Sequence, residues 1–402
     1  MVNINLPKSV YIHIPFCKSK CLYCGFYSKP PNQYDVKRVL NAEIAELKKA
    51  AFQKPVQTLY IGGGSPASVG INSLCEFLSK VVELTGKADE FTVEINPADA
   101  DENLLVNLKN IGVNRISIGA QSFIQSELDF LGRKYSVEKI WQTIKNAKQA
   151  GFKNIGIDLI FAIPNSTLQN WRQTLKRAIQ SDIQHISAYS LSFEKNTPLE
   201  KTKSAGKVKA VDEETDREMY ETVIEELAKA GFEHYEISNF AKPGFKCRHN
   251  LTYCKNNFYL GIGPAAASFS GDYRIENISD IDKYVGYIPL ETKQPSVPSG
   301  YKDLLSLTGC IENNKDVAAE RIKISPLEKA SQTAVLNLRL IEGIDLKEYQ
   351  QKTGFDIYKF FGKSIEKNLN LKLLQLKDNR LSLTKQAMPI ADSVLCDFSE
   401  PD

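Results

Sequence analysis

Three segments of the sequence share one pattern, and this pattern limits the possible folds more than any other feature. They are LLVNLKNIGVNRISIGAQS, IKNAKQAGFKNIGIDLIFAIP and VIEELAKAGFEHYEISNFA. In each, a stretch of helical periodicity leads to a glycine (Gly112, Gly151 or Gly231) and then to a short apolar run. Glycine often follows a helix because it readily adopts the left-handed backbone conformation that ends one. Each segment is therefore expected to be a helix followed by a strand.

Four further apolar runs, VYIHIP, TLYIGGG, FTVEINP and HISAYSLS, continue this alternation and give about seven expected strands. Helical segments between strands are typical of the right-handed crossovers of a parallel sheet. The strands are mostly apolar, as expected when helices cover the outside of the sheet and side chains fill the inside. The sequence predicts an α/β fold, best fitted by a full or partial (β/α) barrel, with a doubly wound sheet as the alternative.

The alternation stops near residue 286. Residues 329–354 and 357–395 are expected to form helices followed by a hairpin, because LLQLKDNRLSLT consists of two short strands around Asp378-Asn379. We therefore expect a core domain over residues 1–285 and a small helical domain of winged-helix type over 286–402. The segment IPLETKQPSVPSG, residues 288–300, is the expected linker.

Charge and hydropathy narrow the possible partners. Lysine plus arginine (51) exceed aspartate plus glutamate (48) by only three, which argues against a nucleic-acid partner and favours a packing or docking role for the winged-helix-like domain. No run approaches the ~18 apolar residues of a membrane span, and MVNINLPKSV lacks the apolar core of a signal peptide. A cytoplasmic protein without an integral membrane segment is expected. In a reducing cytosol its eight cysteines are better explained as core residues, metal ligands or redox groups than as disulfides.

Polar residues that follow the expected strands are the candidate functional residues, because parallel α/β folds bind ligands at the carboxyl ends of their strands. They are Cys17, Cys21 and Cys24, Gly62 to Ser65, Glu94, Gln121 and Asp158. Structural zinc usually requires four ligands, and no second cysteine pair matches this group. His13 could be a fourth ligand, but a lone strand histidine is more often a hydrogen-bonded core or rim residue. Three thiolates suit instead an iron–sulfur cluster with one iron open to an exogenous ligand.

The C-x3-C-x2-C spacing after the first strand, followed by a glycine-rich end of the second, resembles the radical S-adenosylmethionine (radical SAM) enzymes. The similarity extends in order over residues 11–268, through YIHIPFCKSKCLYCGF, YIGGGSPAS, VEINP, RISIGAQSF, LGRKYS, IDLIFAIP, HISAYSLSFEKNTPL and CRHNLTYCKNNFYLGIGPAAAS. These motifs resemble the subfamily of oxygen-independent coproporphyrinogen oxidase (HemN) and the heme chaperone HemW. SPLEKASQTAVLNLRLIEGI resembles the C-terminal domain of that subfamily.

The resemblance implies that Cys17, Cys21 and Cys24 hold a four-iron four-sulfur cluster whose open iron is chelated by SAM. It implies SAM or cluster contacts for Tyr11, Tyr23, Gly63, Gly64, Ser65, Glu94, Gln121, Arg133 and Asp158. Glycine lets the backbone approach the methionyl part of SAM, the Arg133 guanidinium can pair with the SAM carboxylate, and Asp158 can accept from the ribose hydroxyls. Taken singly, an arginine and an aspartate are more often ion-pair residues, and the two tyrosines are at least as often core residues.

Two functions are compatible with the resemblance: a chaperone that transfers heme to acceptor hemoproteins, and an enzyme that oxidatively decarboxylates coproporphyrinogen III. SAM chemistry in either would require an electron donor. Phe26 stands where the oxidases have a further cysteine, and only ten residues precede Tyr11, whereas the oxidases have a longer N-terminal segment. Both features favour the chaperone and an absence of oxidase activity.

A candidate heme motif follows the last of the core strands. HNLTYC resembles the H-N-x-x-Y-W motif of heme chaperones, with Cys254 at the tryptophan position. His249 could bind heme iron through a ring nitrogen, and Cys254 or Cys247 could do so as thiolates. The alternative is that His249 and Asn250 only form hydrogen bonds within a loop.

Overall fold

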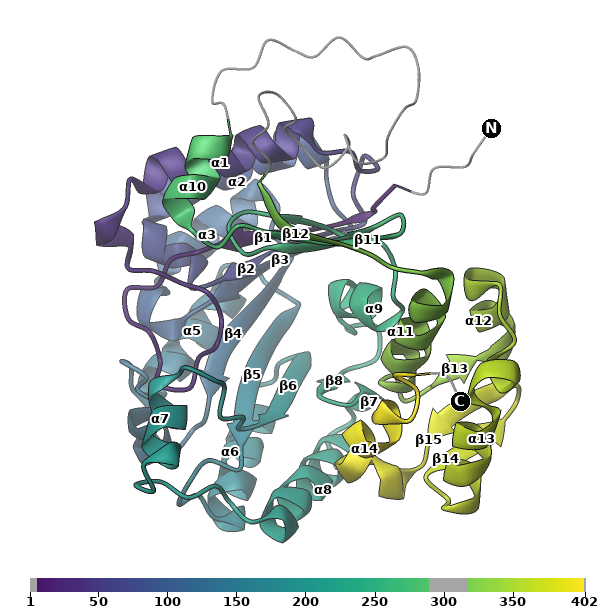
Figure 1. Ribbon diagram of the computed structural model, residues 1–402. Coiled ribbons are helices and arrows are strands. Elements are labelled where there is room, and N and C mark those ends of the chain that lie inside the picture. Colours follow the sequence, from purple (N-terminus) through teal and green to yellow (C-terminus); the bar gives the residue numbers. More distant parts are fainter. Residues whose placement is uncertain (1–5, 289–316, 401–402) are drawn as a thin grey trace, which may run out of the picture. The chain divides into compact units, whose positions relative to one another are not determined.

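A computed structural model describes residues 6–288 and 317–400 of the chain (Figure 1). The chain divides into two compact units, each made of three segments. Unit 1 comprises Met1–Asp158, Ser192–Lys209 and Phe258–Ile322, and unit 2 comprises Leu159–Leu191, Ala210–Asn257 and Lys323–Asp402. The expected domain boundary at residue 286 stays a prediction. Residues 289–300 of the expected linker lie outside the described residues.

The strands occupy every position that the apolar runs predict, and several short ones are added. They are β1 (Ser9–Ile14), β2 (Thr58–Gly63), β3 (Glu90–Ile95), β4 (Arg115–Gln121), β5 (Ile155–Phe161), β6 (His185–Ser190), β7 (Glu233–Glu236), β8 (Asn239–Ala241), β9 (Leu260–Ile262), β10 (Ala267–Ser270), β11 (Tyr273–Asn277), β12 (Ala318–Lys323), β13 (Ile344–Asp345), β14 (Leu374–Lys377) and β15 (Arg380–Leu383).

Helices alternate with the strands of the first part of the chain and dominate its C-terminal part. They are α1 (Val36–Lys49), α2 (Ile71–Thr85), α3 (Glu102–Ile111), α4 (Gln125–Phe130), α5 (Val137–Gln149), α6 (Leu168–Gln180), α7 (Pro198–Ser204), α8 (Glu213–Lys229), α9 (Arg248–Cys254), α10 (Ile281–Tyr287), α11 (Pro326–Leu338), α12 (Leu346–Thr353), α13 (Ile357–Asn370) and α14 (Ala391–Cys396), with short 3-10 turns η1 (Pro31–Gln33), η2 (Pro66–Val69), η3 (Pro97–Asp99) and η5 (Lys385–Ile390).

In unit 1 the strands run parallel in the order β4, β3, β2, β1, β9. The start of β5 lies beside β4, because the Ile116 amide donates to the Asn154 carbonyl at 3.2 Å. Gly112 ends α3 as predicted, with a left-handed φ of 108° and its amide bonded to the last turn of the helix. The prediction of an α/β fold built on a parallel sheet is confirmed.

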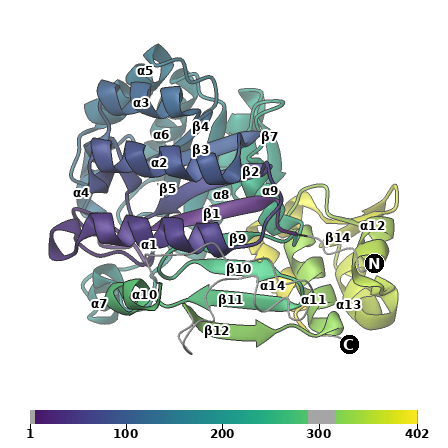
Figure 2. The same ribbon diagram turned by 90° about the horizontal axis from the view of Figure 1, so that it is seen from above.

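The two faces of this sheet differ sharply in chemistry. On one face the side chains are aliphatic and buried, for example Ile12 and its register partner Ile61. The helices α1, α2 and α3 lie side by side along the sheet (Figure 2). On the other face the register places Tyr11 beside Tyr60, Tyr60 beside Thr92 and Thr92 beside Arg115. Because residues in register point the same way, these polar side chains line the opposite face of the sheet.

Several short strands were not predicted, among them β8 and β9. In unit 2, β8 lies between β6 and β7 and is antiparallel to both. Only Ile237 and Ser238 separate β7 from β8, and so short a connection can join only antiparallel strands. In unit 1, β9 pairs with β1, and a Cβ on its Gly261 would lie 2.7 Å from the Ala267 carbonyl carbon. The GIGPAAAS segment, residues 261–268, therefore begins as a strand of the sheet.

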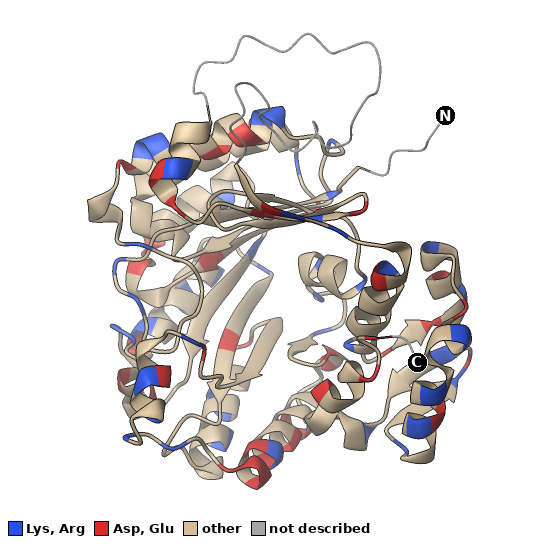
Figure 3. Cartoon of the chain, in the orientation of Figure 1, with Lys and Arg blue, Asp and Glu red and all other residues tan. Residues whose placement is uncertain are grey.

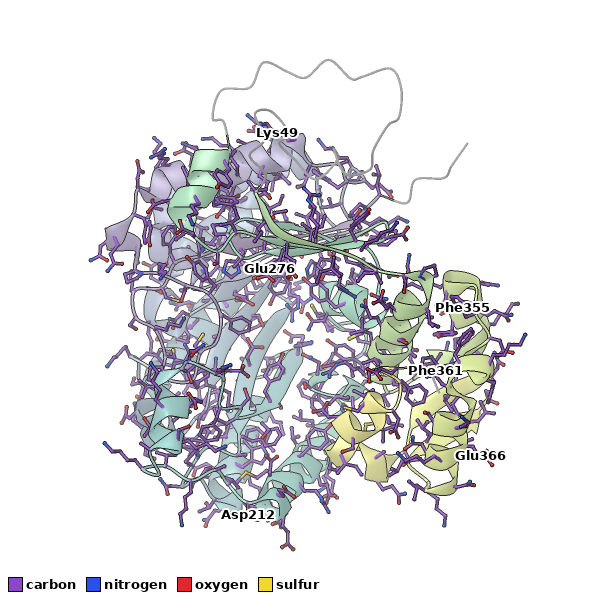
Figure 4. The ribbon with its side chains drawn as sticks, in the orientation of Figure 1. Lys49, Asp212, Glu276, Phe355, Phe361 and Glu366 are labelled. Atoms are coloured by element: carbon purple, nitrogen blue, oxygen red, sulfur yellow. The ribbon has the colours of Figure 1, made fainter. Side chains whose placement is uncertain are left out.

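The C-terminal part of unit 2 has the predicted helices and hairpin. Ser325 and Glu328 form a capping box at the start of α11. The hairpin β14–β15 turns through Asp378 and Asn379, which both have positive φ, as a two-residue hairpin turn requires. Phe361 (Figure 4) is fully buried. Its ring centroid lies 5.4 Å from that of Phe398. Within the described ranges no helix combines the length and apolar character that a bilayer span requires.

Candidate cluster and SAM site

The loop after β1 carries the three cysteines predicted to hold the cluster. Its ends are tied together, because the Cys17 amide donates to the Lys29 carbonyl at 3.0 Å. The Cys24 amide donates to the Cys21 carbonyl at 3.3 Å, and all three thiols are partly exposed. Burial raises the pKa of the Cys17 thiol to about 11. In the described part of the chain no group of three histidine, cysteine, aspartate or glutamate side chains is placed to hold a single metal ion. The loop instead gathers three thiols within eight positions, the donor set of a cluster with one open iron.

Arg133 places a fixed positive charge beside these thiols. Its Nη1 donates to Cys21 Sγ at 3.3 Å and its Nη2 donates to the Gly119 carbonyl at 3.0 Å. The guanidinium carbon lies 5.4 Å from the Tyr135 ring centroid. Its Nε is buried without a hydrogen-bond partner among the described residues. A cation at this position stabilises thiolate over thiol, and the unpaired donor is available to an anionic ligand. Tyr23 shares this environment: burial raises its pKa, and the charge of Arg133 opposes that effect.

The glycines after β2 are required by the chain itself. A Cβ on Gly63, whose φ is 113°, would lie 2.7 Å from the Ile14 carbonyl oxygen. A Cβ on Gly64 would lie 2.7 Å from the Phe16 carbonyl carbon and 3.0 Å from Cys17 Sγ. The end of β2 is thus packed directly against the start of the cysteine loop, at a separation that only glycine permits.

Glu94 and Asp158 bring two carboxyl groups to the polar face of the sheet. Glu94 accepts a hydrogen bond from the Tyr60 hydroxyl at 2.9 Å, and a Cβ on Gly62 would lie 3.0 Å from its carboxyl carbon. Burial, together with the negative charge of Asp158, raises the pKa of Glu94 to about 7. The Ser117 hydroxyl lies 3.4 Å from both carboxylate oxygens of Asp158. A cationic or hydroxyl-bearing ligand placed between these groups would find acceptors on both sides.

Tyr11 and His13 stand on the same face of β1. The Tyr11 hydroxyl and His13 Nδ1 are 3.0 Å apart, and His13 Nε2 is 3.0 Å from the Tyr27 carbonyl oxygen. Burial raises the pKa of Tyr11 and lowers that of His13. The prediction that His13 is a hydrogen-bonded strand histidine is confirmed.

Gln121 ends β4 with a left-handed φ of 65°, which turns the chain away from the sheet. A Cβ on Gly119 would lie 2.9 Å from both Gln121 Nε2 and Arg133 Nη2. Gly119 therefore allows the Gln121 amide and the Arg133 guanidinium to meet over the backbone of β4. Gly119, Tyr60 and Tyr135 were not predicted as site residues, because their contacts depend on which strands and loops become neighbours in the fold.

The candidate heme ligands lie in unit 2, in and beside α9. His249 is only 1% exposed, and its Nε2 is 2.8 Å from the Tyr253 hydroxyl one helical turn later. Cys254 is buried, which raises the pKa of its thiol to about 12. Cys247 is also buried, and its amide donates to the Tyr235 hydroxyl at 3.3 Å. For either residue of α9 to bind iron, its side chain would have to leave its present surroundings.

Comparison with known proteins places these features in a family. A model of the radical SAM superfamily matches residues 11–178, and a model of the HemN C-terminal domain matches residues 324–390. The heme chaperone HemW of Bacillus subtilis (strain 168) is 30% identical over 399 residues, which span 97% of this chain and 99% of that protein. The chain belongs to the HemW family. HemW of Lactococcus lactis subsp. lactis (strain IL1403) is 29% identical over 98% of this chain and 97% of its own length, and HemW of Synechocystis sp. is 32% identical over 84% and 79%.

The fold of this HemW family member is shared with a solved structure. The radical SAM enzyme HemN of Escherichia coli, a coproporphyrinogen III oxidase, superposes with a TM-score of 0.78 at 18% identity, over 98% of this chain and 90% of that one. The expected fold, an α/β core of radical SAM type with a small C-terminal helical domain, is confirmed. Membership of the radical SAM superfamily implies a four-iron four-sulfur cluster and SAM, and the three thiols with their neighbouring guanidinium fit that pair.

Proposed function

We propose that this protein binds heme and transfers it to acceptor hemoproteins in the cytoplasm, and that it holds a cluster on Cys17, Cys21 and Cys24 with SAM beside it. The observation that carries this proposal is the 30% identity with a heme chaperone over 97% of the chain. The arrangement of the three thiols beside Arg133 supports the cluster. The HNLTYC segment supports the heme site.

Different residues of the site would bind the cluster and different parts of SAM. When bound, the cluster supplies single electrons from a donor protein to the SAM sulfonium. Arg133 would balance the negative charge of the cluster ligands and offer its unpaired Nε to the SAM carboxylate. Glu94 and Asp158 would accept from the SAM amino and ribose groups, while Tyr11, Tyr23 and Gln121 enclose them. Gly63, Gly64 and Ser65 keep the backbone close to the cysteine loop.

Coproporphyrinogen III oxidase activity is the alternative function. The fold shared with HemN does not favour it, because a likeness at 18% identity extends to the fold and not to the reaction. Phe26, at the position where the oxidases have a cysteine, has an exposed fraction of 71%. The chain thus presents an apolar ring there in place of a thiol.

An anaerobic assay of purified, cluster-loaded protein tests both functions. One vessel contains SAM, a reductant and coproporphyrinogen III, and the other contains heme. We expect no protoporphyrinogen in the first vessel and a heme absorption spectrum in the second. That spectrum should shift in His249→Ala or Cys254→Ala but not in the control His234→Ala, which alters another histidine of unit 2. Formation of protoporphyrinogen would establish the oxidase, and the absence of any heme spectrum would refute the chaperone.

A further inference from the structure

Asp99, the last residue of η3, bridges two loops of the candidate site. Its Oδ1 accepts from Lys18 Nζ at 2.7 Å, and its Oδ2 accepts from the Ser65 hydroxyl at 2.8 Å. The Asp99 side chain is only 5% exposed, so a buried carboxylate is held by a cation on one oxygen and a hydroxyl on the other. Hydrogen bonds to a carboxylate of this kind are among the stronger ones in proteins.

Both partners of Asp99 belong to the predicted cofactor site. Lys18 lies between Cys17 and Cys21 in the cysteine loop, and Ser65 follows the glycines of β2. The Ser65 amide also donates to the carbonyl of Phe16, the residue before Cys17, at 2.7 Å. One carboxylate therefore joins the loop after β1, the loop after β2 and the turn after β3.

The turn that carries Asp99 is itself fixed in position. Asn96 caps it, because its side-chain oxygen accepts from the Ala98 amide at 3.2 Å, and Pro97 restricts the backbone at its first residue. The Asp99 amide donates to the Asn96 carbonyl at 2.9 Å. The carboxylate is thus presented by a rigid turn.

The cysteine loop cannot supply this negative charge from its own sequence. Over residues 17–29 its charged side chains are Lys18, Lys20 and Lys29, with no acidic residue (Figure 3). Asp99 comes from a turn some 70 positions later in the chain and is the partner of Lys18. The positive charge of Lys18 is therefore balanced by a carboxylate from outside the loop, and the same carboxylate binds Ser65.

We propose that Asp99 is a positioning residue, which fixes the cysteine loop against the SAM side of the site through Lys18 and Ser65. The proposal rests on the cofactor site proposed above, but the link itself is formed without cluster or SAM. Asp99 touches neither predicted ligand. Its role is to fix the position of the thiols relative to the residues after β2, because a binding site works only when its groups are held within a fraction of an ångström of the required geometry.

The first test uses metal-free protein and measures how fast each cysteine is alkylated, by mass spectrometry. Asp99→Asn keeps the shape of the side chain and removes its charge. We expect Cys17 and Cys21 to react about 5-fold faster in this variant, which corresponds to about 1 kcal/mol of lost loop stability. Cys75 on α2 and Cys396 on α14 serve as internal references and should keep their rates.

Lys20→Met is the matched control, because Lys20 lies on the same loop but donates to the Phe26 carbonyl and not to Asp99. It should leave the alkylation of Cys17 unchanged. Lys18→Met removes the more exposed half of the link, and its effect should be smaller, about 2-fold, because Lys18 has an exposed side-chain fraction of 62% and such pairs contribute little.

The second test follows the change in the electron paramagnetic resonance spectrum of the reduced cluster as SAM is added. In Asp99→Asn we expect about 10-fold weaker SAM binding at unchanged iron content, the size typical of second-layer partners of a metal site. Unchanged alkylation and unchanged SAM affinity would overturn the proposal. Equal acceleration of all thiols, including Cys75 and Cys396, would also overturn it, since it would show general destabilisation. If wild-type protein bound no cluster or SAM, the proposed cofactor site would fail while the alkylation test still reported on the link.

Discussion

Glu43 of α1 is fully buried, and neither of its carboxyl oxygens has a hydrogen-bond partner among the described residues. Burial, together with the charge of Glu46 one turn later, raises its pKa well above the ordinary value. Glu43 is therefore protonated in the folded protein at pH values where the unfolded chain has already lost that proton. Its contribution to stability is fully present below its unfolded-state pKa and is lost as the pH rises toward its folded-state value.

Glu43→Gln should remove this dependence on pH. Between pH 5 and pH 8 the free energy of unfolding of the variant should rise relative to that of the wild type. The difference should change by at most about 1.4 kcal/mol per pH unit, because one proton is involved. Urea denaturation at several pH values measures the difference. Glu83→Gln, an exposed glutamate of α2, is the control and should give a curve parallel to the wild type. Parallel curves for Glu43→Gln as well would show that Glu43 is ionised in the fold.

Arg133 and Asp158 permit a test of the proposed SAM contacts. Replacing both with alanine removes the guanidinium that donates to Cys21 and the carboxylate beside Ser117. We expect SAM affinity, measured by equilibrium dialysis of cluster-loaded protein, to fall by about 10- to 100-fold. Lys134→Ala, which removes the neighbouring cation, should leave the affinity within about 2-fold, as expected for an exposed charge. An unchanged affinity in the double variant would show that the residues were assigned wrongly.

At the scale of elements, Gly64 joins β2 to the cysteine loop. Gly64→Ala should distort that contact, because the new methyl group would lie 3.0 Å from Cys17 Sγ and closer still to the Phe16 backbone. We expect a loss of about 1–3 kcal/mol of stability, as for other overpacked sites, and a reduced iron content after reconstitution.

Gly286→Ala on α10 is the control for this change, since nothing lies within 4 Å of a Cβ at that position and its backbone is helical. It should leave iron content unchanged and raise stability slightly. Normal iron content in Gly64→Ala would mean that the loop after β1 adapts to the added methyl group.

The sequence predicts elements where a local signal is strong. Apolar runs mark β1 to β7, Gly112 marks the end of α3, and Asp378-Asn379 marks the turn of the C-terminal hairpin. The strands β8 and β9 have only three residues each, too few for a periodic pattern, and are defined by the strands they pair with. The link from Asp99 to Lys18 was not predicted either. It forms where two turns that are distant in the sequence come into contact, and neither turn carries a motif that would indicate it.

At the scale of the whole molecule, the two predicted sites belong to different units. The cysteines and the proposed SAM contacts are in unit 1, whereas His249 and Cys254 are in unit 2. Each motif is recognisable in the sequence, and a hydrogen-bonded His249 was one of the two alternatives it offered. Its bond to Tyr253 is local, four residues on in the same helix. Its burial was not predicted, because burial depends on the tertiary surroundings of α9.

Removal of the cluster should therefore act locally. A ligand that binds only the folded state stabilises the unit that holds it, so chelation of iron should increase hydrogen exchange in residues 15–30 of unit 1. The helices α11 to α13 of unit 2 should keep their exchange rates. Mass spectrometry of peptides from holo and iron-free protein measures both regions in one experiment. A uniform increase over both units would show that the cluster supports the whole chain.

The carboxylate of Glu46 accepts from the Gly263 amide at 2.9 Å, the Asn277 amide group at 2.7 Å and the Tyr284 hydroxyl at 2.5 Å. Gly263 comes 217 residues later than Glu46. During translation these donors reach the carboxylate only after about 10–50 seconds, at the usual rate of about 5–20 residues per second. Over that interval the nascent chain also leaves β1 without its neighbour β9, as an open edge to which other chains can pair. The last segment of unit 1 runs to Ile322, so completion of the unit waits for the ribosome to pass that residue, and the first strand synthesised is among the last to be paired on both sides.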